Sequence, residues 1–426
     1  MARHGLPQGT LPVGMGLLIS GLCAYGFLVV SGRALGPTRY SQLSVLWSAT
    51  FLLGVGLFLP LEQELARALS VRRTRGLGGR AVVVRGAWVS GLMLVAIALG
   101  SLPWQTEIVS RFFDGESAFL LALGLALFAL AIGHVARGFL SGTGQFGRYG
   151  ALNAAEGLIR LVPAVVLALI GVSLGLPFAL AFALAPLLAV LTIAAGPFKR
   201  TETGPACGAG ELNISIVKLI AASVLGQALI NLPVLTVKFL ATESQAALAG
   251  RFMAGVVLAR VPVILFSAVQ AALLPKLSSL EAMSKHAEFR RALLKLAQVV
   301  GGIGLAATLG AWSLGAPVIR LFFGSNFELH PTDLVYLAAA SSFYLLALAL
   351  AQGLVALSAY GRMVVGWSVG LLAGVAVTAQ SGPLLLRVER GFLAGSIAAS
   401  ITMGFVVLRR LAVEQDSVTT ASAPAL

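Results

Sequence analysis

Three basic residues lie inside apolar stretches long enough to cross a bilayer, where a charge needs a physical reason. Arg160 and Arg260 lie near the middle of their stretches, and Lys218 lies in the third of its stretch that is nearest the cytoplasm. A charge at mid-bilayer depth costs about 2.5–3.5 kcal/mol on insertion scales. Cations that line a watery cavity attract an anion, and a guanidinium suits phosphate because its planar fork binds two oxygens. We interpret all three as candidate anion-binding groups.

Each of these residues also has a simpler interpretation. Glu156 precedes Arg160 by four positions, so the two side chains can neutralise each other on one helix face. Lys218 is close enough to a membrane surface for its ammonium group to reach water. Arg260 has no acidic residue three or four positions away in its own stretch. Arg260 is therefore the strongest candidate for a cavity-lining cation.

Uncharged and acidic residues supply further candidates. Gln227 and Asn231 are four positions apart and could present amides to a polar lumen or to a neighbouring helix. Glu156, Glu62 and Glu64 are candidates for a gate or for ion coupling. Glu62 and Glu64 end an apolar stretch, so an interfacial position is the alternative for them. His134 lies beside Arg137 and is more typical of a structural histidine.

The elements that position these residues are apolar stretches of about twenty residues, the length of a membrane-spanning helix. Of the 426 residues, 58% are hydrophobic and 11% are charged, against roughly 25% charged in soluble domains. Continuous apolar runs indicate helices rather than a barrel. The expected spans are residues 11–32, 41–62, 86–104, 118–139, 150–171, 174–195, 213–235, 249–272, 297–318, 333–355, 363–380 and 391–408.

The formal net charge of +14 indicates the orientation of the protein in the membrane rather than nucleic-acid binding. Most Lys and Arg residues fall in connections on one side when the N-terminus is placed inside. This bias follows the positive-inside rule and predicts an even number of crossings with both termini cytoplasmic. We expect a multi-pass protein of the inner (cytoplasmic) membrane that contacts membrane lipids.

A polar segment at 198–212 divides the spans into six and six. Its glycines, proline and mixed charge are typical of a linker. We predict a six-helix bundle at 1–197, a cytoplasmic linker at 198–212, a second six-helix bundle at 213–410 and a disordered cytoplasmic tail at 411–426. Residues 35–43 and 240–248 are similar segments at equivalent positions of the two halves. Such a duplication predicts bundles related by pseudo-two-fold symmetry, with a substrate route between them.

Catalytic chemistry is not indicated by any motif. The sequence has no metal-ligand spacing, no phosphate-binding loop with its lysine and no Ser/His/Asp set. Cys23 lies in the first span and Cys207 in the linker, so a disulfide between them is not expected. We expect neither a cofactor nor a metal, and a protein that is not an enzyme.

Five short segments, together with the number and spacing of the spans, carry a resemblance to a known family. The segments are Arg33–Pro37 with Tyr40, Ala136–Gly138, Gly147–Tyr149, Val237–Leu240 and Leu274–Ser278. In these segments the chain resembles the oligosaccharide flippases, or polysaccharide biosynthesis proteins, of the multidrug/oligosaccharidyl-lipid/polysaccharide (MOP) exporter superfamily. Where many relatives carry an acidic residue late in the seventh span, this chain has Asn231-Leu232-Pro233.

The resemblance implies a flippase that moves an undecaprenyl-(pyro)phosphate-linked saccharide across the membrane by alternating access, with H⁺ or Na⁺ as a coupling ion. The alternative is an ion-coupled exporter of drugs or small metabolites from the same superfamily. A membrane glycosyltransferase is a third class, but the short outer connections leave little room for its catalytic acids. The saccharide and the oligomeric state are left open by the sequence.

Overall fold

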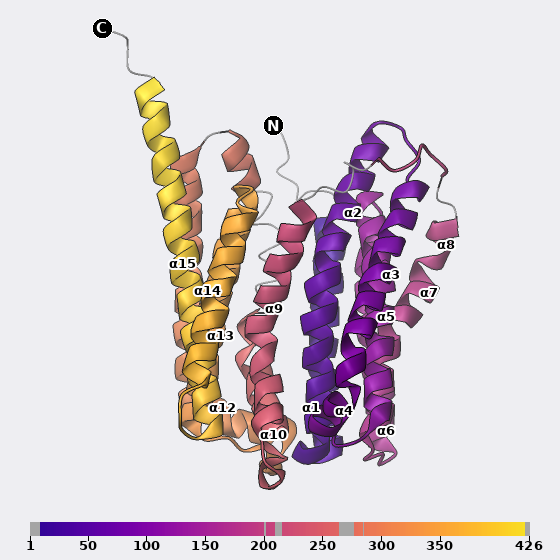
Figure 1. Ribbon diagram of the computed structural model, residues 1–426, viewed down its shortest axis with the longest axis vertical. Coiled ribbons are helices and arrows are strands. Elements are labelled where there is room, and N and C mark those ends of the chain that lie inside the picture. Colours follow the sequence, from indigo (N-terminus) through magenta and orange to yellow (C-terminus); the bar gives the residue numbers. More distant parts are fainter. Residues whose placement is uncertain (1–8, 200–201, 209–214, 264–276, 284, 422–426) are drawn as a thin grey trace. The chain divides into compact units, whose positions relative to one another are not determined.

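The computed structural model describes residues 9–199, 202–208, 215–263, 277–283 and 285–421. Every regular element in these ranges is a helix (Figure 1). Ten helical stretches within them are long and apolar enough to cross a membrane, and the first, Leu11–Thr74, contains two of the expected spans. The expected span at 249–272 is described only as far as residue 263. These findings confirm the predicted all-α polytopic membrane protein.

The expected spans at 86–104, 118–139, 150–171, 174–195, 333–355 and 363–380 each correspond to one helix. The α-helices are α1 (Thr10–Thr50), α2 (Gly56–Thr74), α3 (Arg80–Ser101), α4 (Gln105–Phe113), α5 (Ser117–Gly142), α6 (Phe146–Leu169), α7 (Gly175–Ile193), α8 (Ala195–Lys199), α9 (Ser215–Leu240), α10 (Leu248–Ala259), α12 (His286–Phe323), α13 (Pro331–Ala356), α14 (Tyr360–Thr378) and α15 (Leu384–Ala421). Shorter turns are the π-helical η1 (Phe51–Val55) and the 3₁₀ turns η2 (Leu102–Trp104), η3 (Glu243–Gln245) and η4 (Ser325–Phe327).

The chain reverses direction within α1 at Gly36. Gly36 has φ 70° and ψ 166°, a conformation outside the helical region, and Pro37 follows it. Glycine tolerates this positive φ because it has no Cβ, and proline suits the start of the next helical segment. Gly16 and Ala66, on either side of this break, both approach the region of the α5–α6 connection. The first two expected spans therefore form a hairpin with Gly36 at its far end.

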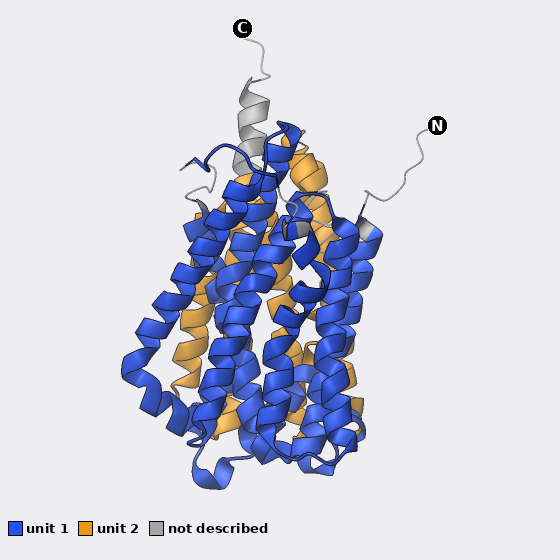
Figure 2. Cartoon of the chain, turned by 90° about the vertical axis from the view of Figure 1, so that its right-hand side faces the viewer, with its two compact units in different colours: residues 1–257, 318–328 blue, residues 258–317, 329–426 orange. Residues whose placement is uncertain are grey.

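The first compact unit comprises residues 1–257 and 318–328 (Figure 2). Its α1 and α6 approach closely through small residues: a Cβ at Gly150 would lie 2.1 Å from the Pro12 carbonyl oxygen. Small residues let helix backbones pack tightly in a membrane. The unit also includes α9, whose buried Lys238 donates to Asp114 Oδ1 and Oδ2 at 2.8 Å and to Ser41 Oγ at 3.1 Å.

The second compact unit comprises residues 258–317 and 329–426. Its α14 carries a glycine every fourth residue, at Gly366, Gly370 and Gly374. These glycines face Met403, Ala399 and the backbone of Gly391 on α15. The spacing places the glycines on one helix face. Close α14–α15 packing therefore depends on this ladder of small residues.

The compact units differ from the bundles expected at 1–197 and 213–410. Contacts assign α9 and residues 318–328 to the first unit, so the boundary does not follow the linker. Linker residues are themselves held by that unit, because Arg72 donates to the Pro205 and Ala206 carbonyls and Arg85 to the Cys207 carbonyl. α15 continues to Ala421 and so covers most of the segment expected to be a disordered tail.

Candidate functional site

A stripe of polar residues runs along one face of α6. Tyr149, Asn153, Glu156 and Arg160 follow one another at intervals of four, three and four residues, the spacing that places side chains on a single helix face. Asn153, Glu156 and Arg160 are all less than 10% exposed. Buried polar groups in an apolar span need partners, so the stripe predicts matching groups on the helices that cover it.

Two arginines neutralise Glu156. Arg160 Nη2 donates to Glu156 Oε1 at 2.7 Å, and Arg137 Nη1, from α5, donates to Glu156 Oε2 at 2.7 Å. Each oxygen of the carboxylate thus accepts a charge-assisted hydrogen bond, the stronger kind of such bond. The i,i+4 pair anticipated from the sequence is present, but the second arginine comes from a different helix.

Glu62 of α2 is the second acid in this cluster. His134 Nδ1 lies 2.7 Å from Glu62 Oε2, and Arg137 Nε donates to the same oxygen at 3.3 Å. The Tyr149 hydroxyl donates to Glu62 Oε1 at 3.0 Å. Glu62 is 6% exposed and His134 is 5% exposed. Both residues are therefore buried members of the cluster.

Glu62, His134, Arg137, Tyr149, Glu156 and Arg160 form what we term the charge network. It alternates in sign from Glu62 through Arg137 and Glu156 to Arg160. With both acids ionised, the charges of the two arginines balance them, and His134 Nδ1 can donate to Glu62. His134 Nε2 is buried without a hydrogen bond in the described residues. The network joins α2, α5 and α6 through charges that are costly to separate in a low-dielectric interior.

Aromatic rings cover the end of the network at Arg160. Its guanidinium carbon lies 5.5 Å from the centroid of the Trp47 ring and 5.2 Å from that of Phe182. Cations are attracted to aromatic faces at such distances. Arg160 is 4% exposed. The structure thus places Arg160 in an ion pair under aromatic rings, not on an open surface.

The other predicted site residues lie outside the charge network. Lys218 is exposed near the start of α9, and Arg260 is half-buried just after α10. Arg260 is near enough to Tyr344 for its charge to act on that hydroxyl. Asn231 Nδ2 donates to Gln227 Oε1 and to the Gln227 carbonyl, both at 3.0 Å. The two amides therefore bind each other.

Glu64, the remaining gate candidate, is 7% exposed. Its carboxylate accepts two hydrogen bonds from Arg67, at 2.9 and 2.6 Å. The pair is formed within α2 three residues apart. Glu64 is therefore paired within its own helix, whereas Glu62 binds residues of α5 and α6.

A buried acid of the second unit was missed by the sequence analysis. Glu389, the sixth residue of α15, is fully buried, and Asp333 of α13 lies beside it. Neither Glu389 oxygen has a hydrogen-bond partner in the described part of the chain. The burial of Glu389 depends on neighbouring helices, which its position in the sequence does not reveal.

Comparison with known proteins defines the fold. No family model matches the chain. The uncharacterized protein Rv3630 of Mycobacterium tuberculosis is 28% identical over 88% of this chain and 84% of its own length. Another protein of that organism, the uncharacterized protein Rv1510, is 27% identical over 90% of this chain and 88% of its own length.

Solved structures of similar fold are transporters rather than enzymes. An inward-facing multidrug resistance MATE family transporter of the MOP superfamily matches with a TM-score of 0.73 and 17% identity over 97% of this chain and 99% of its own. A MOP superfamily transporter from Pyrococcus furiosus matches with a TM-score of 0.67 and 17% identity, with 96% of each chain covered. This protein therefore has the two-bundle fold of MATE transporters and is a multi-pass membrane protein.

Proposed function

We propose that this protein exports a lipid-linked saccharide across the cytoplasmic membrane by alternating access. The likeness in fold to MATE transporters over nearly the whole chain supports an exporter. The Pyrococcus furiosus structure is described as having a binding pocket of reversed polarity that suggests a different function. The fold therefore accommodates pockets of different charge, and the charge in the spans of this chain becomes the guide to its cargo.

The observation that carries the choice of cargo is the position of the basic residues. The charge network is balanced, so it adds no net charge to the membrane interior. Arg260 and Lys218 are basic residues of the spans that lie outside it. We assign Arg260, in the second unit, to the anionic phosphate of a lipid-linked saccharide, which a guanidinium recognises through two oxygens. Lys218, in the first unit, is a separate candidate contact for an anion. Arg160, held by Glu156, is assigned to the network instead.

The charge network supplies a second element of the proposed mechanism. Glu62 and Glu156 tie α2, α5 and α6 together, and alternating access requires helices of a bundle to rearrange. We assign to these acids the role of a latch whose pairing is exchanged when H⁺ or Na⁺ binds. Histidine suits such a latch because its ordinary titration range lies between pH 5 and 8.

The test is transport of a fluorescent undecaprenyl-pyrophosphate saccharide in liposomes. We expect Arg260→Ala to slow transport at least about tenfold, because a charge-assisted contact is worth about 1.5–3 kcal/mol. Arg260→Lys should retain part of the rate. Arg362→Ala is the matched control, since Arg362 is exposed at the start of α14. Unchanged transport in both Arg260 variants would contradict the proposal.

Export of cationic drugs is the second candidate function. It is favoured by the multidrug transporters among the structural neighbours and by buried Glu389 with half-buried Asp333 beside it, since acids attract cations. Deletion of the gene separates the two functions. Loss of a surface glycan without altered drug susceptibility supports the flippase, whereas increased drug susceptibility with normal glycans supports the drug exporter.

A further inference from the structure

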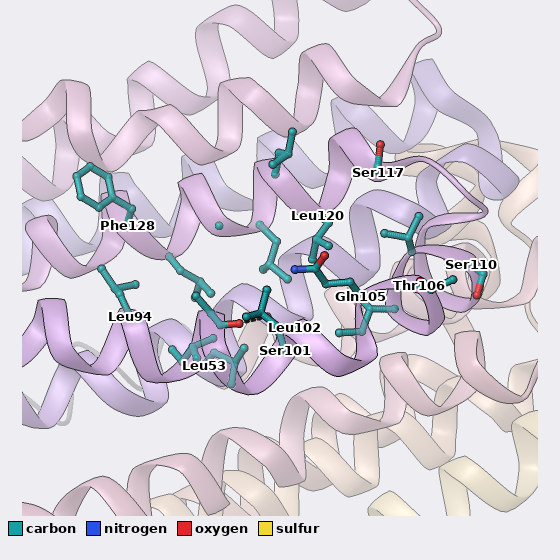
Figure 3. Close-up of a pocket in the computed structure, with 18 of the residues that line it drawn as sticks. Leu53, Leu94, Ser101, Leu102, Gln105, Thr106, Ser110, Ser117, Leu120 and Phe128 are labelled. Carbon is teal, nitrogen blue, oxygen red and sulfur yellow. Dashed lines mark hydrogen bonds between the residues drawn. The ribbon is translucent and has the colours of Figure 1, made fainter.

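The first unit contains a cavity of about 900 Å³ that the proposed function does not use. It is lined by residues of α3, η2, α4 and α5 and by Leu53 of η1 (Figure 3). It lies toward the end of α3 that is remote from the arginine-rich start of that helix at Arg80. A volume of this size is within the range of small-molecule sites, about 300–1,000 Å³.

The lining of the cavity is polar at one end and apolar at the other. Gln105, Thr106 and Ser117 lie toward one end, and Leu94 and Phe128 lie toward the other (Figure 3). The polar end is formed by α4 and by the first residue of α5. Apolar side chains of the helix interiors form the remainder. A ligand with a polar group at one end and a hydrocarbon chain at the other matches this gradient.

The polar end also lies at the depth of a membrane interface. Trp104, immediately before α4, is 64% exposed, and exposed tryptophans mark the headgroup region of membrane proteins. Beyond Trp104, α3 presents Leu92, Val95 and Leu99 to its surroundings. The cavity thus runs from the interface into the hydrocarbon region beside a lipid-facing helix, where membrane lipid is the abundant amphiphile.

The charge of the lining distinguishes between two kinds of lipid. Among the residues that the structure describes, no acidic or basic one lines the cavity. The nearby Glu107 and Arg111 are exposed and form an ion pair with each other. A pyrophosphate at the polar end would lack a cationic partner, whereas ester carbonyls need only uncharged donors such as the amide of Gln105 and the hydroxyl of Thr106.

We propose that this cavity binds a phospholipid, with its ester region at Gln105 and one acyl chain extending toward Leu94 and Phe128. Neither Arg260 nor Lys218, the residues assigned to an anionic cargo, is among the described residues that line this cavity, and the inference does not depend on the saccharide being the cargo. Gly124 provides part of the space: a Cβ built on it meets no atom within 4 Å. A large side chain at this position would occupy the path of the acyl chain.

The test is photolabelling by phosphatidylethanolamine that carries a diazirine on one acyl chain, added to the full-length protein in detergent. Labelled peptides are mapped by mass spectrometry. We expect labels to concentrate on residues 94–128. Gly124→Trp should reduce that labelling at least about tenfold, whereas Gly91→Trp should not. Gly91 is the matched control because it lies on α3, has the same open surroundings and does not line the cavity.

A second variant and a competition experiment complete the test of the proposed lipid site. If Gly124→Trp does not yield a monodisperse protein, Gln105→Leu provides the test, with an expected loss of labelling of about threefold from one lost hydrogen bond. Equal labelling in the Gly124 and Gly91 variants, or labels spread evenly along α3, would show annular lipid only and overturn the proposal. Stronger competition by undecaprenyl pyrophosphate than by unlabelled phosphatidylethanolamine would also overturn it, because the occupant would then be a polyprenyl lipid.

Discussion

The two compact units contain buried acids in opposite circumstances. In the first unit, Glu62 and Glu156 each accept hydrogen bonds from basic side chains on α5 or α6. In the second unit, fully buried Glu389 lies beside another acid, Asp333, and no ion pair with a basic residue is found for it in the described part of the chain. In the first unit, the charges of the buried acids are balanced by arginines. In the second unit, the described residues include no basic partner for buried Glu389.

This difference separates two uses of buried charge. Paired charges hold helices in one arrangement, because removing either partner leaves the other uncompensated in a low-dielectric interior. An acid without a basic partner gains little from ionisation in place and depends on a proton or a cation. In the first unit the buried acids are thus paired with basic side chains, whereas Glu389 in the second unit is buried beside another acid.

The largest expected effect comes from removing the centre of the charge network. Arg137→Met leaves both Glu62 and Glu156 short of a cation, and we expect a loss of about 3–5 kcal/mol in the free energy of unfolding. Denaturant unfolding of the purified protein measures it. Adding Glu156→Gln should restore part of the loss. A loss below about 1 kcal/mol in the single variant would mean that the network does not hold the unit together.

A smaller effect is expected at the edge of the network. Tyr149→Phe removes one of the hydrogen bonds to Glu62 and leaves those from His134 and Arg137, so we expect a loss of about 1–2 kcal/mol. Tyr360→Phe at the start of α14 is the control, because Tyr360 belongs to the second unit and the network to the first. The same unfolding experiment measures both variants, and equal losses would contradict a specific role for Tyr149.

The smallest effect is expected in the second unit. Glu389→Gln exchanges an acid beside Asp333 for a neutral group of the same shape, and we expect a change in unfolding free energy below about 1 kcal/mol. Glu156→Gln, its counterpart in the first unit, should cost about 3 kcal/mol. If the two variants lose the same stability, the contrast between the units is wrong.

Local spacing predicted part of the candidate site. The four-residue separation of Glu156 and Arg160 indicated their ion pair, and the structure contains it. The positions of Tyr149 and Asn153 extend the same face of α6, so the polar stripe is visible in the sequence. Glu62, His134 and Arg137 lie on α2 and α5, and no spacing within one helix relates them to α6. Their meeting depends on how three helices pack.

The boundary between the two compact units also depends on helix packing and not on the composition of the linker. The linker at 198–212 predicted a boundary by composition, yet α9 packs with the first unit, where Lys238 binds Asp114. The stacking of Phe239 on Phe112, with ring centroids 5.7 Å apart, adds to this contact. Chain order alone does not show such contacts, because they join residues more than a hundred positions apart.

Hydrophobic length and charge bias in the amino-acid sequence determined that this protein is a helical membrane protein with about twelve spans. These properties are local, since a bilayer imposes the same length on every span. Tertiary structure decided which buried charges meet, because helical periodicity fixes the face on which a side chain lies but not the helix that this face contacts.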